Sequence, residues 1–258
     1  MGLIKERMAA GEFTRVIGIG RVMHHNLVQI IGMQGGFHGV WFDHEHCGFS
    51  IEQLEIGTLA ARSQGLDNFV RIAPTDYALV SKCLEPGGSG IMAAQIVSAE
   101  QAEEIVAWTK FRPRGTRGLN VSGYDGRFGT IPAAQYCEQA NRDTLVAIQV
   151  ETTGAVDDCD QIAAIDGVDL LFVGPADLSQ SLGVTGDFFN PKCIEAIDRV
   201  SAACRKHGKQ WGAVSAGPEH AGMLVEKGCK LLSPSNDSRL ITSGLQAVKD
   251  QYANFFEE

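Results

Sequence analysis

The feature that most constrains the fold is an alternation along nearly the whole chain. Short apolar runs rich in Val, Ile and Phe, typical of buried strands, alternate with longer amphipathic stretches, typical of helices. The expected strands are residues 16–20, 39–43, 69–73, 90–95, 144–151, 168–173, 210–214 and 230–233, and the expected helices between them are 26–33, 51–64, 76–84, 99–111, 155–164, 191–207 and 218–226. Eight strands joined by helices predict an α/β fold with a parallel sheet closed into a (β/α)8 barrel.

The length agrees with one such barrel. The chain has 258 residues, close to the roughly 250 that a barrel of this kind needs, so residues 1–258 are expected to form a single domain. Helix starts are marked by Ser50 with Gln53, Ser98 with Gln101, and Asn190 followed by proline. Glycines mark several helix ends, at positions 65, 87, 208 and 228.

Three segments do not fit the repeated unit. Residues 1–11 are expected to form a helix before the first strand, and residues 112–143 form a long insertion that is rich in Gly and Arg and ends in a short helix near 133–140. The tail after Asp237 has one helical pattern with an apolar stripe at Leu240, Ile241, Leu245 and Val248. This extra helix could dock on a partner subunit or cover the flank of its own barrel.

Charge and composition exclude several classes of partner. The formal net charge is −9, with 22 Lys plus Arg against 31 Asp plus Glu, and no basic run suits a phosphate backbone, so no nucleic-acid partner is expected. No apolar stretch approaches the roughly 18 residues of a membrane span, and the first residues lack a signal core. We therefore expect a cytoplasmic protein without a membrane partner. The seven cysteines form no C-x-x-C pair and are expected to be reduced core residues.

Polar residues gather where the strands are expected to end. The second strand runs into Asp43-His44-Glu45-His46, the third carries Arg71, the fifth ends in Gln149-Val150-Glu151, and the sixth runs into Gly174-Pro175-Ala176-Asp177. In a closed parallel barrel all these ends meet at one mouth, where active sites lie.

Glu151 and Asp177 are the candidate metal ligands. They follow neighbouring strands, which lie about 4.8 Å apart, so their carboxylates can converge on one ion. Oxygen ligands favour a hard cation such as Mg²⁺ or Mn²⁺. Gln149 faces the same side as Glu151 and could hold a ligand or a water. The alternative is that both carboxylates are solvated strand-end charges or helix caps.

Arg71 and the histidines are candidate catalytic groups. A guanidinium at the end of a buried strand needs an anion, which could be a substrate carboxylate, an enolate oxygen or a structural acid. Asp43 and His46 could form an orienting acid and a proton-transferring histidine, whereas the roles of His44 and Glu45 stay open. Lysines fall in helices or loops, or at the wrong end of a strand in the case of Lys230, so Schiff-base chemistry is not expected.

The motifs WFDHEH, FVRIA, AIQVET and LLFVGPADLSQSLG resemble, in order and spacing, those of HpcH/HpaI-type class II pyruvate aldolases, which cleave 2-keto-3-deoxy acids and 4-hydroxy-2-oxoheptanedioate. The resemblance implies a barrel in which Glu151 and Asp177 bind a divalent cation (Mg²⁺, Mn²⁺ or Co²⁺) and Arg71 steadies the enolate oxygen. It implies that His46 with Asp43 moves the proton. Main-chain amides of Ala176 and Asp177 would receive the pyruvate carboxylate, with Gln149 as a polar contact.

The resemblance also concerns assembly and substrate. Family members form homo-oligomers, hexamers built as trimers of dimers, whose subunits exchange a terminal helix, which would suit the tail. The family commonly has a small residue at the position of His44 and an apolar one near Ser215, so a more polar pocket, with Ser215 as a contact, is expected for the aldehyde half.

The favoured interpretation is an aldehyde-lyase that makes or breaks 4-hydroxy-2-oxo acids from pyruvate and an aldehyde through a pyruvate enolate. One alternative is another metal-dependent carbon–carbon lyase of the superfamily, condensing or decarboxylating. The other is a catalytically silent barrel that binds a small acid.

Overall fold

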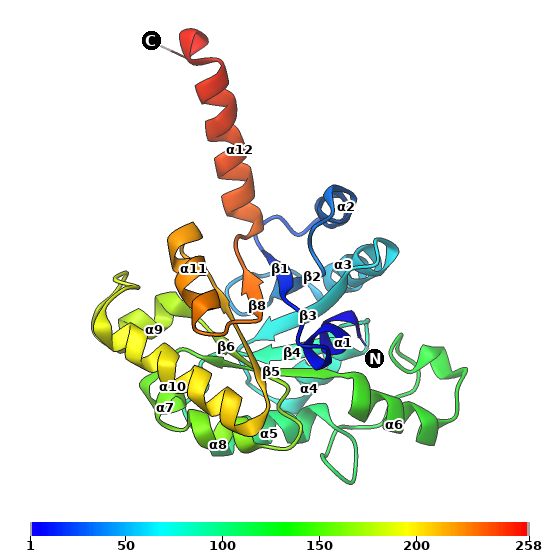
Figure 1. Cartoon of the computed structure of the whole chain (residues 1–258). Helices are drawn as coiled ribbons and strands as arrows, with labels where there is room; N and C mark the ends of the chain where they lie inside the picture. Colours follow the sequence, from blue (N-terminus) through cyan, green and yellow to red (C-terminus); the bar gives the residue numbers. More distant parts are fainter. Residues whose placement is uncertain (1, 257–258) are drawn as a thin grey trace.

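The eight apolar runs are the strands of a closed parallel barrel in the computed structural model, which describes residues 2–256. Each strand pairs with the next, and β8 closes onto β1. The strands are β1 (Thr14–Ile19), β2 (Gly39–Asp43), β3 (Asp67–Ile72), β4 (Gly90–Ala93), β5 (Leu145–Val150), β6 (Leu170–Val173), β7 (Gln210–Val214) and β8 (Leu231–Ser233). The predicted (β/α)8 fold is confirmed (Figure 1).

Helices surround this barrel in the expected order. They are α1 (Leu3–Ala9), α2 (His25–Gln34), α3 (Ile51–Ser63), α4 (Tyr77–Leu84), α5 (Ala99–Thr109), α6 (Ala133–Asp143), α7 (Thr153–Asp157), α8 (Cys159–Ala164), α9 (Pro175–Ser181), α10 (Pro191–His207), α11 (Pro218–Glu226) and α12 (Asp237–Gln251), with short 3-10 turns at Arg127–Gly129 and Ala253–Phe255. The observed first helix, α1, is shorter than the expected residues 1–11. Met1 lies outside the described residues.

Two helices differ from the expectation. The predicted helix 155–164 is divided into α7 and α8 at Asp158, whose carboxylate accepts a hydrogen bond from the Ala99 amide at 2.9 Å. The helix α9 is not among the expected helices, because residues 174–177 are expected only to follow the sixth strand and no element is expected at residues 178–181. The Ser50 capping box is complete, whereas Gln101 accepts from Val97 instead of Ser98, so the second box is only half formed.

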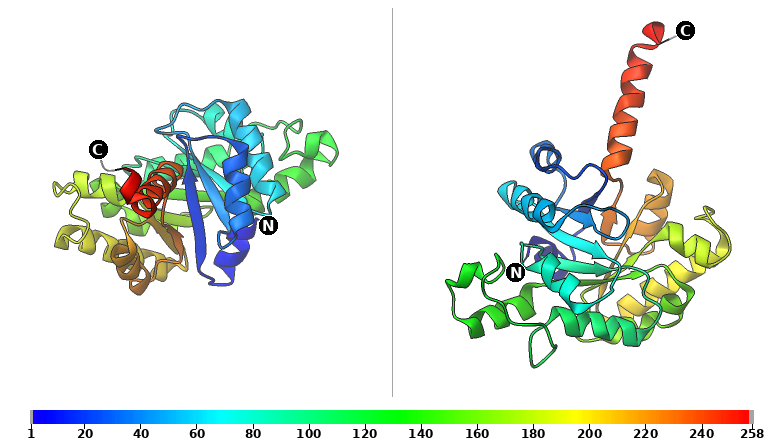
Figure 2. Two further views of the ribbon diagram at one scale, coloured as in Figure 1. Left: turned by 90° about the horizontal axis from the view of Figure 1, so that it is seen from above. Right: turned by 180° about the vertical axis from the view of Figure 1, so that it is seen from behind.

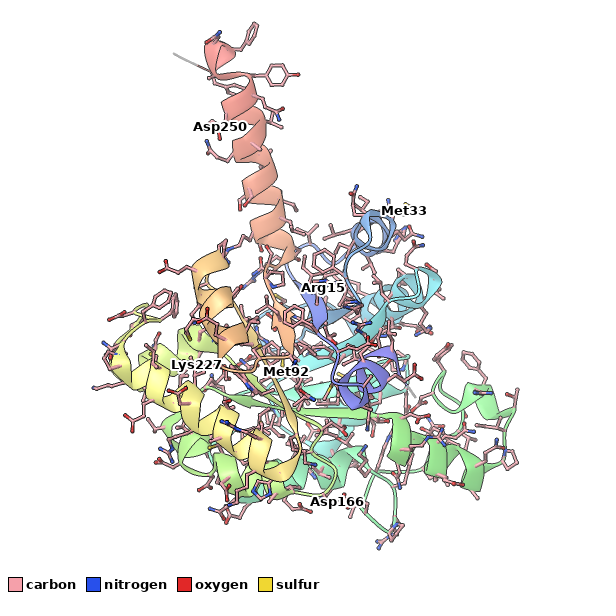
Figure 3. All side chains as sticks on the ribbon, in the orientation of Figure 1. Arg15, Met33, Met92, Asp166, Lys227 and Asp250 are labelled. Atoms are coloured by element: carbon pink, nitrogen blue, oxygen red, sulfur yellow. The ribbon has the colours of Figure 1, made fainter. Side chains whose placement is uncertain are left out.

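The interior of the barrel is filled by large side chains. Trp41, Phe69, Met92 and Phe172 belong to one buried cluster, and Met92 lies deep in the molecule (Figure 3). Ile4 of α1 joins this cluster, and the Ile4 amide donates to Asp67, the first residue of β3, at 2.9 Å. The helix α1 therefore closes the amino-terminal end of the barrel and leaves the carboxyl ends of the strands as the open mouth.

The insertion at residues 112–143 also lies at the amino-terminal end. The Tyr124 amide donates to Glu85 O at the end of α4, and Lys110 Nζ donates to Thr144 O, just before β5. The insertion is therefore not a lid over the mouth of its own barrel.

The helix α12 projects away from the barrel as a single rod (Figures 1 and 2). Side chains along its outer half, including Asp250, stand clear of the other elements (Figure 3). Its apolar stripe is exposed: Leu240, Ile241, Leu245 and Val248 keep 38–61% of their surface accessible. The tail therefore does not cover the flank of its own barrel, which was one of the two arrangements considered for it. Within residues 2–256 no helix is long and apolar enough to cross a membrane.

Candidate active site

The mouth brings together the polar residues that follow β2, β3, β5 and β6. The β2–β3 register places Asp43 directly opposite Arg71, and the β5–β6 register ends with Val150 opposite Val173, one residue before Glu151 and Gly174. The sequence-predicted site residues Asp43, Arg71, Gln149 and Glu151 are all buried here.

Arg71 and Asp43 form a bidentate ion pair. Arg71 Nε lies 3.0 Å from Asp43 Oδ1, and Arg71 Nη2 lies 2.7 Å from Oδ2. Burial by itself would raise the pKa of Asp43, but hydrogen bonding and the charge of Arg71 outweigh burial, so the pKa lies below its usual value. The anion that the buried guanidinium requires is thus supplied by the protein. The Arg71 guanidinium also lies 4.9 Å from the Trp41 ring centroid.

Asp43 does not orient the imidazole of His46 as expected. Its carboxylate accepts hydrogen bonds from the main-chain amides of Glu45 and His46, at 3.1 and 3.2 Å, and is otherwise occupied by Arg71 and the Cys47 thiol. Asp43 therefore shapes the turn that carries His46. Asp43 pairs with Arg71 and not with the His46 imidazole because the strand register places Arg71 directly opposite it, within reach of both carboxylate oxygens.

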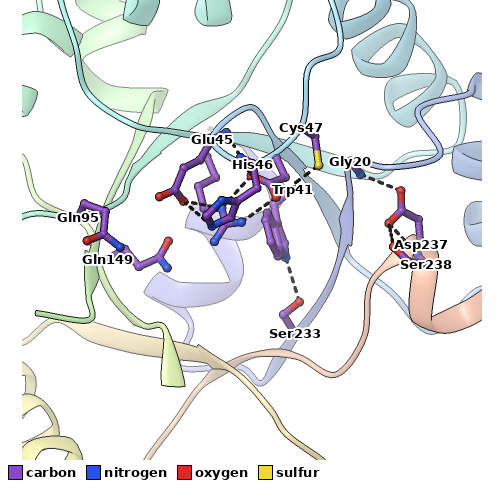
Figure 4. Close-up of polar contacts among 12 residues, drawn as sticks. Gly20, Trp41, Glu45, His46, Cys47, Gln95, Gln149, Ser233, Asp237 and Ser238 are labelled. Atoms are coloured by element: carbon purple, nitrogen blue, oxygen red, sulfur yellow. Dashed lines mark hydrogen bonds and ion pairs between the residues drawn. The ribbon is translucent and has the colours of Figure 1, made fainter. Parts of the chain in front are cut away.

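Glu45, which the sequence left unassigned, faces the site. Its side chain is 8% exposed, and its Oε2 lies 3.3 Å from Arg71 Nε and 3.7 Å from His46 Nε2. His46 is 53% exposed, so its imidazole is accessible beside a buried carboxylate (Figure 4). Burial raises the pKa of Glu45, and the charges of Asp43 and Asp177 add to this, although Arg71 and His46 act in the opposite direction.

Glu151 is the most perturbed carboxylate of the mouth. Burial raises its pKa to about 7, the charges of Asp177 and Glu45 add to the effect, and a hydrogen bond from Gln95 and the charge of Arg71 oppose it. Glu151 Oε1 accepts from the Gln95 amide at 2.8 Å and from its side chain at 3.2 Å, while Oε2 accepts from Gln149 Nε2. Three carboxylates therefore lie close enough to repel one another.

Gln95 is a residue that sequence reasoning missed. Its backbone is left-handed (φ 54°), a strained conformation for a residue other than glycine, and in this conformation its amide donates to Glu151. Figure 4 shows Gln95 beside Gln149. The available signal was its position: Gln95 follows the fourth apolar run as Glu151 follows the fifth.

Small residues leave room around Glu151. A Cβ atom at Gly174 would collide with the Glu151 carboxylate and the Gln149 side-chain amide. Gln149 Oε1 is buried and has no hydrogen-bond partner among the described residues. Next to Gly174, Ala176 is exposed, and Asp177 lies half-buried in the first turn of α9.

The remaining predicted positions lie around this centre. Ser215 is buried after β7, and its amide donates to Ser233 O at 3.1 Å. Ser233 Oγ in turn accepts from Trp41 Nε1 at 2.9 Å (Figure 4). The His44 amide donates to Arg71 O, and its ring packs edge-on against Phe49.

No lysine is among the buried polar residues of the mouth within residues 2–256. The buried lysine of residues 2–256 is Lys110, whose pKa burial lowers to about 8. Its Nζ donates to Asn141 O and Thr144 O, at the amino-terminal end of the barrel and away from the polar residues of the mouth. Within the same residues, no group of three or more His, Cys, Asp or Glu side chains is arranged to hold a metal ion.

Known proteins resemble this chain in sequence and in fold. The model of the HpcH/HpaI aldolase/citrate lyase family matches residues 24–243. A 5-keto-4-deoxy-D-glucarate aldolase of Klebsiella pneumoniae is 30% identical over 224 residues, 87% of this chain and 86% of the relative. An HpcH/HpaI aldolase/citrate lyase family protein of Burkholderia cenocepacia superposes with a TM-score of 0.89 at 28% identity, covering 98% and 100% of the two chains. The citrate synthase SbnG shares the fold, with a TM-score of 0.88, 24% identity and full coverage of both chains.

Proposed function

The chain belongs to the HpcH/HpaI aldolase/citrate lyase family, and we propose that it is a divalent-metal-dependent aldolase of 4-hydroxy-2-oxo acids, with pyruvate and an aldehyde as the products of cleavage. The observation that carries this proposal is the convergence of the Arg71 guanidinium with four carboxylates, those of Asp43, Glu45, Glu151 and Asp177, in a mouth where no lysine is found among the described residues. Such a site can stabilise an enolate by charge but not through a Schiff base.

The donor set fits a hard divalent cation. Glu151 and Asp177 repel each other and Glu45 when all are ionised, and a cation between them would remove this repulsion. The unpartnered Gln149 Oε1 is a further oxygen donor at the same place. Glu151 and Asp177 would hold the ion, and two protein carboxylates suit a cation that keeps positions for water and substrate. When bound, the cation supplies Lewis-acid stabilisation of negative charge on the 2-oxo oxygen.

Arg71 would steady the same oxygen from the protein side. Its fork is fixed by Asp43 and by the Trp41 ring, so the guanidinium does not have to reorganise when charge develops. The main-chain amides of Ala176 and Asp177, in the first turn of α9, would receive the pyruvate carboxylate. Ser215 would contact the aldehyde half.

His46 would move the protons. In cleavage, the C4 hydroxyl loses its proton, the C3–C4 bond breaks, and its electron pair becomes the enolate of pyruvate while C4 becomes the aldehyde. Protonation of the enolate at C3 then gives pyruvate. The accessible imidazole, with Nε2 facing Glu45 at 3.7 Å, can carry a proton in either direction.

The names of relatives support the substrate class. 5-Keto-4-deoxy-D-glucarate is a six-carbon diacid and, numbered from its keto end, a 4-hydroxy-2-oxo acid. Its cleavage between the carbons numbered 3 and 4 from that end leaves pyruvate and a three-carbon aldehyde that keeps the second carboxylate.

The proposal also includes assembly. We propose a homo-oligomer, with a trimer of dimers as the expected form, in which the exposed stripe of α12 packs on a second copy of the chain. The support is the 38–61% exposure of Leu240, Ile241, Leu245 and Val248 on a helix that leaves its own barrel.

A pyruvate-release screen tests the activity. 4-Hydroxy-2-oxo acids, including 5-keto-4-deoxy-D-glucarate, would be supplied with EDTA, Mg²⁺, Mn²⁺ or Co²⁺, using wild type, Glu151→Ala and Asp177→Ala. We expect release that needs a metal and is lost in both variants while circular dichroism shows a folded barrel. Full release by wild type in EDTA would overturn the metal assignment, and no release from any acid would overturn the aldolase.

A further inference from the structure

Two adjoining cavities extend from the reacting groups toward the connection between β1 and α2. The first, of about 270 Å³, is lined by Asp43, Arg71 and His46. The second, of about 430 Å³, lies between the β1–α2 and β2–α3 connections. Gly20, Arg21 and Cys47 line both of them. A molecule that occupies the first cavity can therefore extend past Arg21 into the second.

Arg21 is the unpaired cation in these walls. Asp43 is neutralised by Arg71, and Asp237 accepts hydrogen bonds from the amides of Gly20, Val22 and Ser238. Arg21 itself makes no hydrogen bond or ion pair within residues 2–256, and its side chain is exposed.

Arg21 lines the same cavity as Asp43, His46 and Arg71. Cys47 Sγ is 3.7 Å from Asp43 Oδ2. Burial and the charge of Asp43 raise the pKa of the Cys47 thiol, and the charge of Arg21 opposes this rise. Arg21, Cys47, Asp43 and Arg71 thus line one cavity, and the charge of Arg21 is close enough to act on the Cys47 thiol.

The backbone of Arg21 is held in place although its side chain is free. Asp237 Oδ2 accepts from the Gly20 amide at 2.9 Å and from the Val22 amide at 2.6 Å, the residues on either side of Arg21 (Figure 4 shows the Gly20 contact). Anchoring both neighbours reduces the conformational entropy that Arg21 would lose on binding an anion.

We propose that Arg21 determines acceptor specificity by binding a carboxylate at the end of the aldehyde remote from its carbonyl. The inference rests on the proposed aldolase activity and names the residue that distinguishes acidic from neutral acceptors. A guanidinium fork binds a carboxylate through two parallel hydrogen bonds, and no other cation in the two walls is free to do so among the described residues.

The test compares two four-carbon acceptors, 4-oxobutanoate and butanal, in addition to pyruvate. The readout is the ratio of kcat/KM for the acid to kcat/KM for the neutral aldehyde, which corrects for any loss of active enzyme. We expect Arg21→Gln to lower this ratio by roughly tenfold, mainly through KM for 4-oxobutanoate, because one charged hydrogen-bonding group is lost. Arg21→Lys should keep part of the preference.

Arg205→Gln is the matched control. Arg205 is an exposed arginine of α10, away from the mouth, and its replacement removes the same charge. A ratio in Arg21→Gln equal to that of wild type, or an equal fall in Arg205→Gln, would overturn the assignment of Arg21.

Solvent exchange of the pyruvate methyl protons, measured without acceptor, separates the two proposals. If wild type exchanges these protons and adds aldehydes, but the acid-to-neutral ratio does not change in Arg21→Gln, only the specificity assignment is overturned. Wild type that neither exchanges nor adds overturns the aldolase and this inference with it.

Discussion

At the scale of single residues, the mutual repulsion of Glu45, Glu151 and Asp177 should make the stability of the metal-free protein depend on pH. The pKa of Glu151 is about 7 in the folded state, against an ordinary value of 4.5. At a pH between these two pKa values, Glu151 therefore takes up a proton when the protein folds. The contribution of Glu151 to the free energy of unfolding should be greatest below about pH 4.5 and should fall by roughly 3 kcal/mol as pH rises to about 7.

Urea unfolding in EDTA at several pH values between 5 and 8 measures this fall, and Glu151→Gln should reduce it. Adding Mg²⁺ should remove most of the dependence in wild type, because a bound cation stabilises the ionised carboxylate. Identical pH dependence in wild type and Glu151→Gln would show that Glu151 is not the group that takes up the proton.

Arg71 should matter more for the developing enolate than for the bound ketone. Arg71→Lys keeps the charge but loses the fork that engages Asp43 through both oxygens. We expect kcat to fall more than the apparent affinity for pyruvate. Steady-state kinetics of cleavage and addition measure both, and an unchanged kcat would return Arg71 to a purely structural role.

His46 should be needed for proton transfer but not for binding the metal. In His46→Ala, exchange of pyruvate methyl protons in D₂O, followed by NMR without aldehyde, should fall by roughly 10² to 10⁴, the usual effect of losing a general base. Mn²⁺ binding should persist. Glu45→Gln is the companion variant, since Glu45 lies 3.7 Å from the imidazole. If proton exchange persists in His46→Ala but is lost in Glu45→Gln, the proton-transferring group is the Glu45 carboxylate.

At the scale of elements, one buried side chain links the start of α12 to the connection after β1. Asp237 is 2% exposed and accepts from the amides of Gly20 and Val22. Asp237→Ala leaves both amides without this acceptor, so we expect a loss of about 2 to 3 kcal/mol in the free energy of unfolding. Thermal or urea unfolding measures it.

Asp250→Ala is the control on the same helix. Asp250 is exposed and accepts from Gln246 one turn away, a contact of only a few tenths of a kcal/mol. If the two substitutions lower the free energy of unfolding equally, the hydrogen bonds of Asp237 to Gly20 and Val22 do not stabilise the protein more than an exposed contact does.

At the scale of the whole molecule, the projecting α12 predicts association. Replacing Ile241 and Leu245 together by Glu puts two charges on the exposed stripe, and we expect the oligomer to dissociate to monomers at micromolar concentration because charges there would be buried against a second copy. Light scattering after size-exclusion chromatography measures the mass. Ser243→Glu, on the opposite face of the helix, should leave the mass unchanged, and a wild-type monomer would contradict the proposed assembly.

The sequence alone was enough to predict the barrel and several of the polar residues at its mouth. Strand periodicity is local, so the eight apolar runs could be located to within a few residues, and β2 and β7 to the residue. Once the sheet is parallel and closed, all its carboxyl ends share one rim. That constraint is why Asp43, Arg71, Gln149 and Glu151 could be grouped although more than 100 residues separate the first from the last.

Only the tertiary structure decided which partner each side chain takes. Asp43 binds Arg71 and the His46 amide, whereas His46 faces Glu45, because strand register and turn conformation set these distances and neither is encoded in residue spacing. The left-handed backbone of Gln95 and the helix α9 likewise depend on contacts between elements. The sequence also left the direction of α12 undetermined. An apolar stripe predicts that one face of a helix is buried, but it does not identify the surface that covers this face.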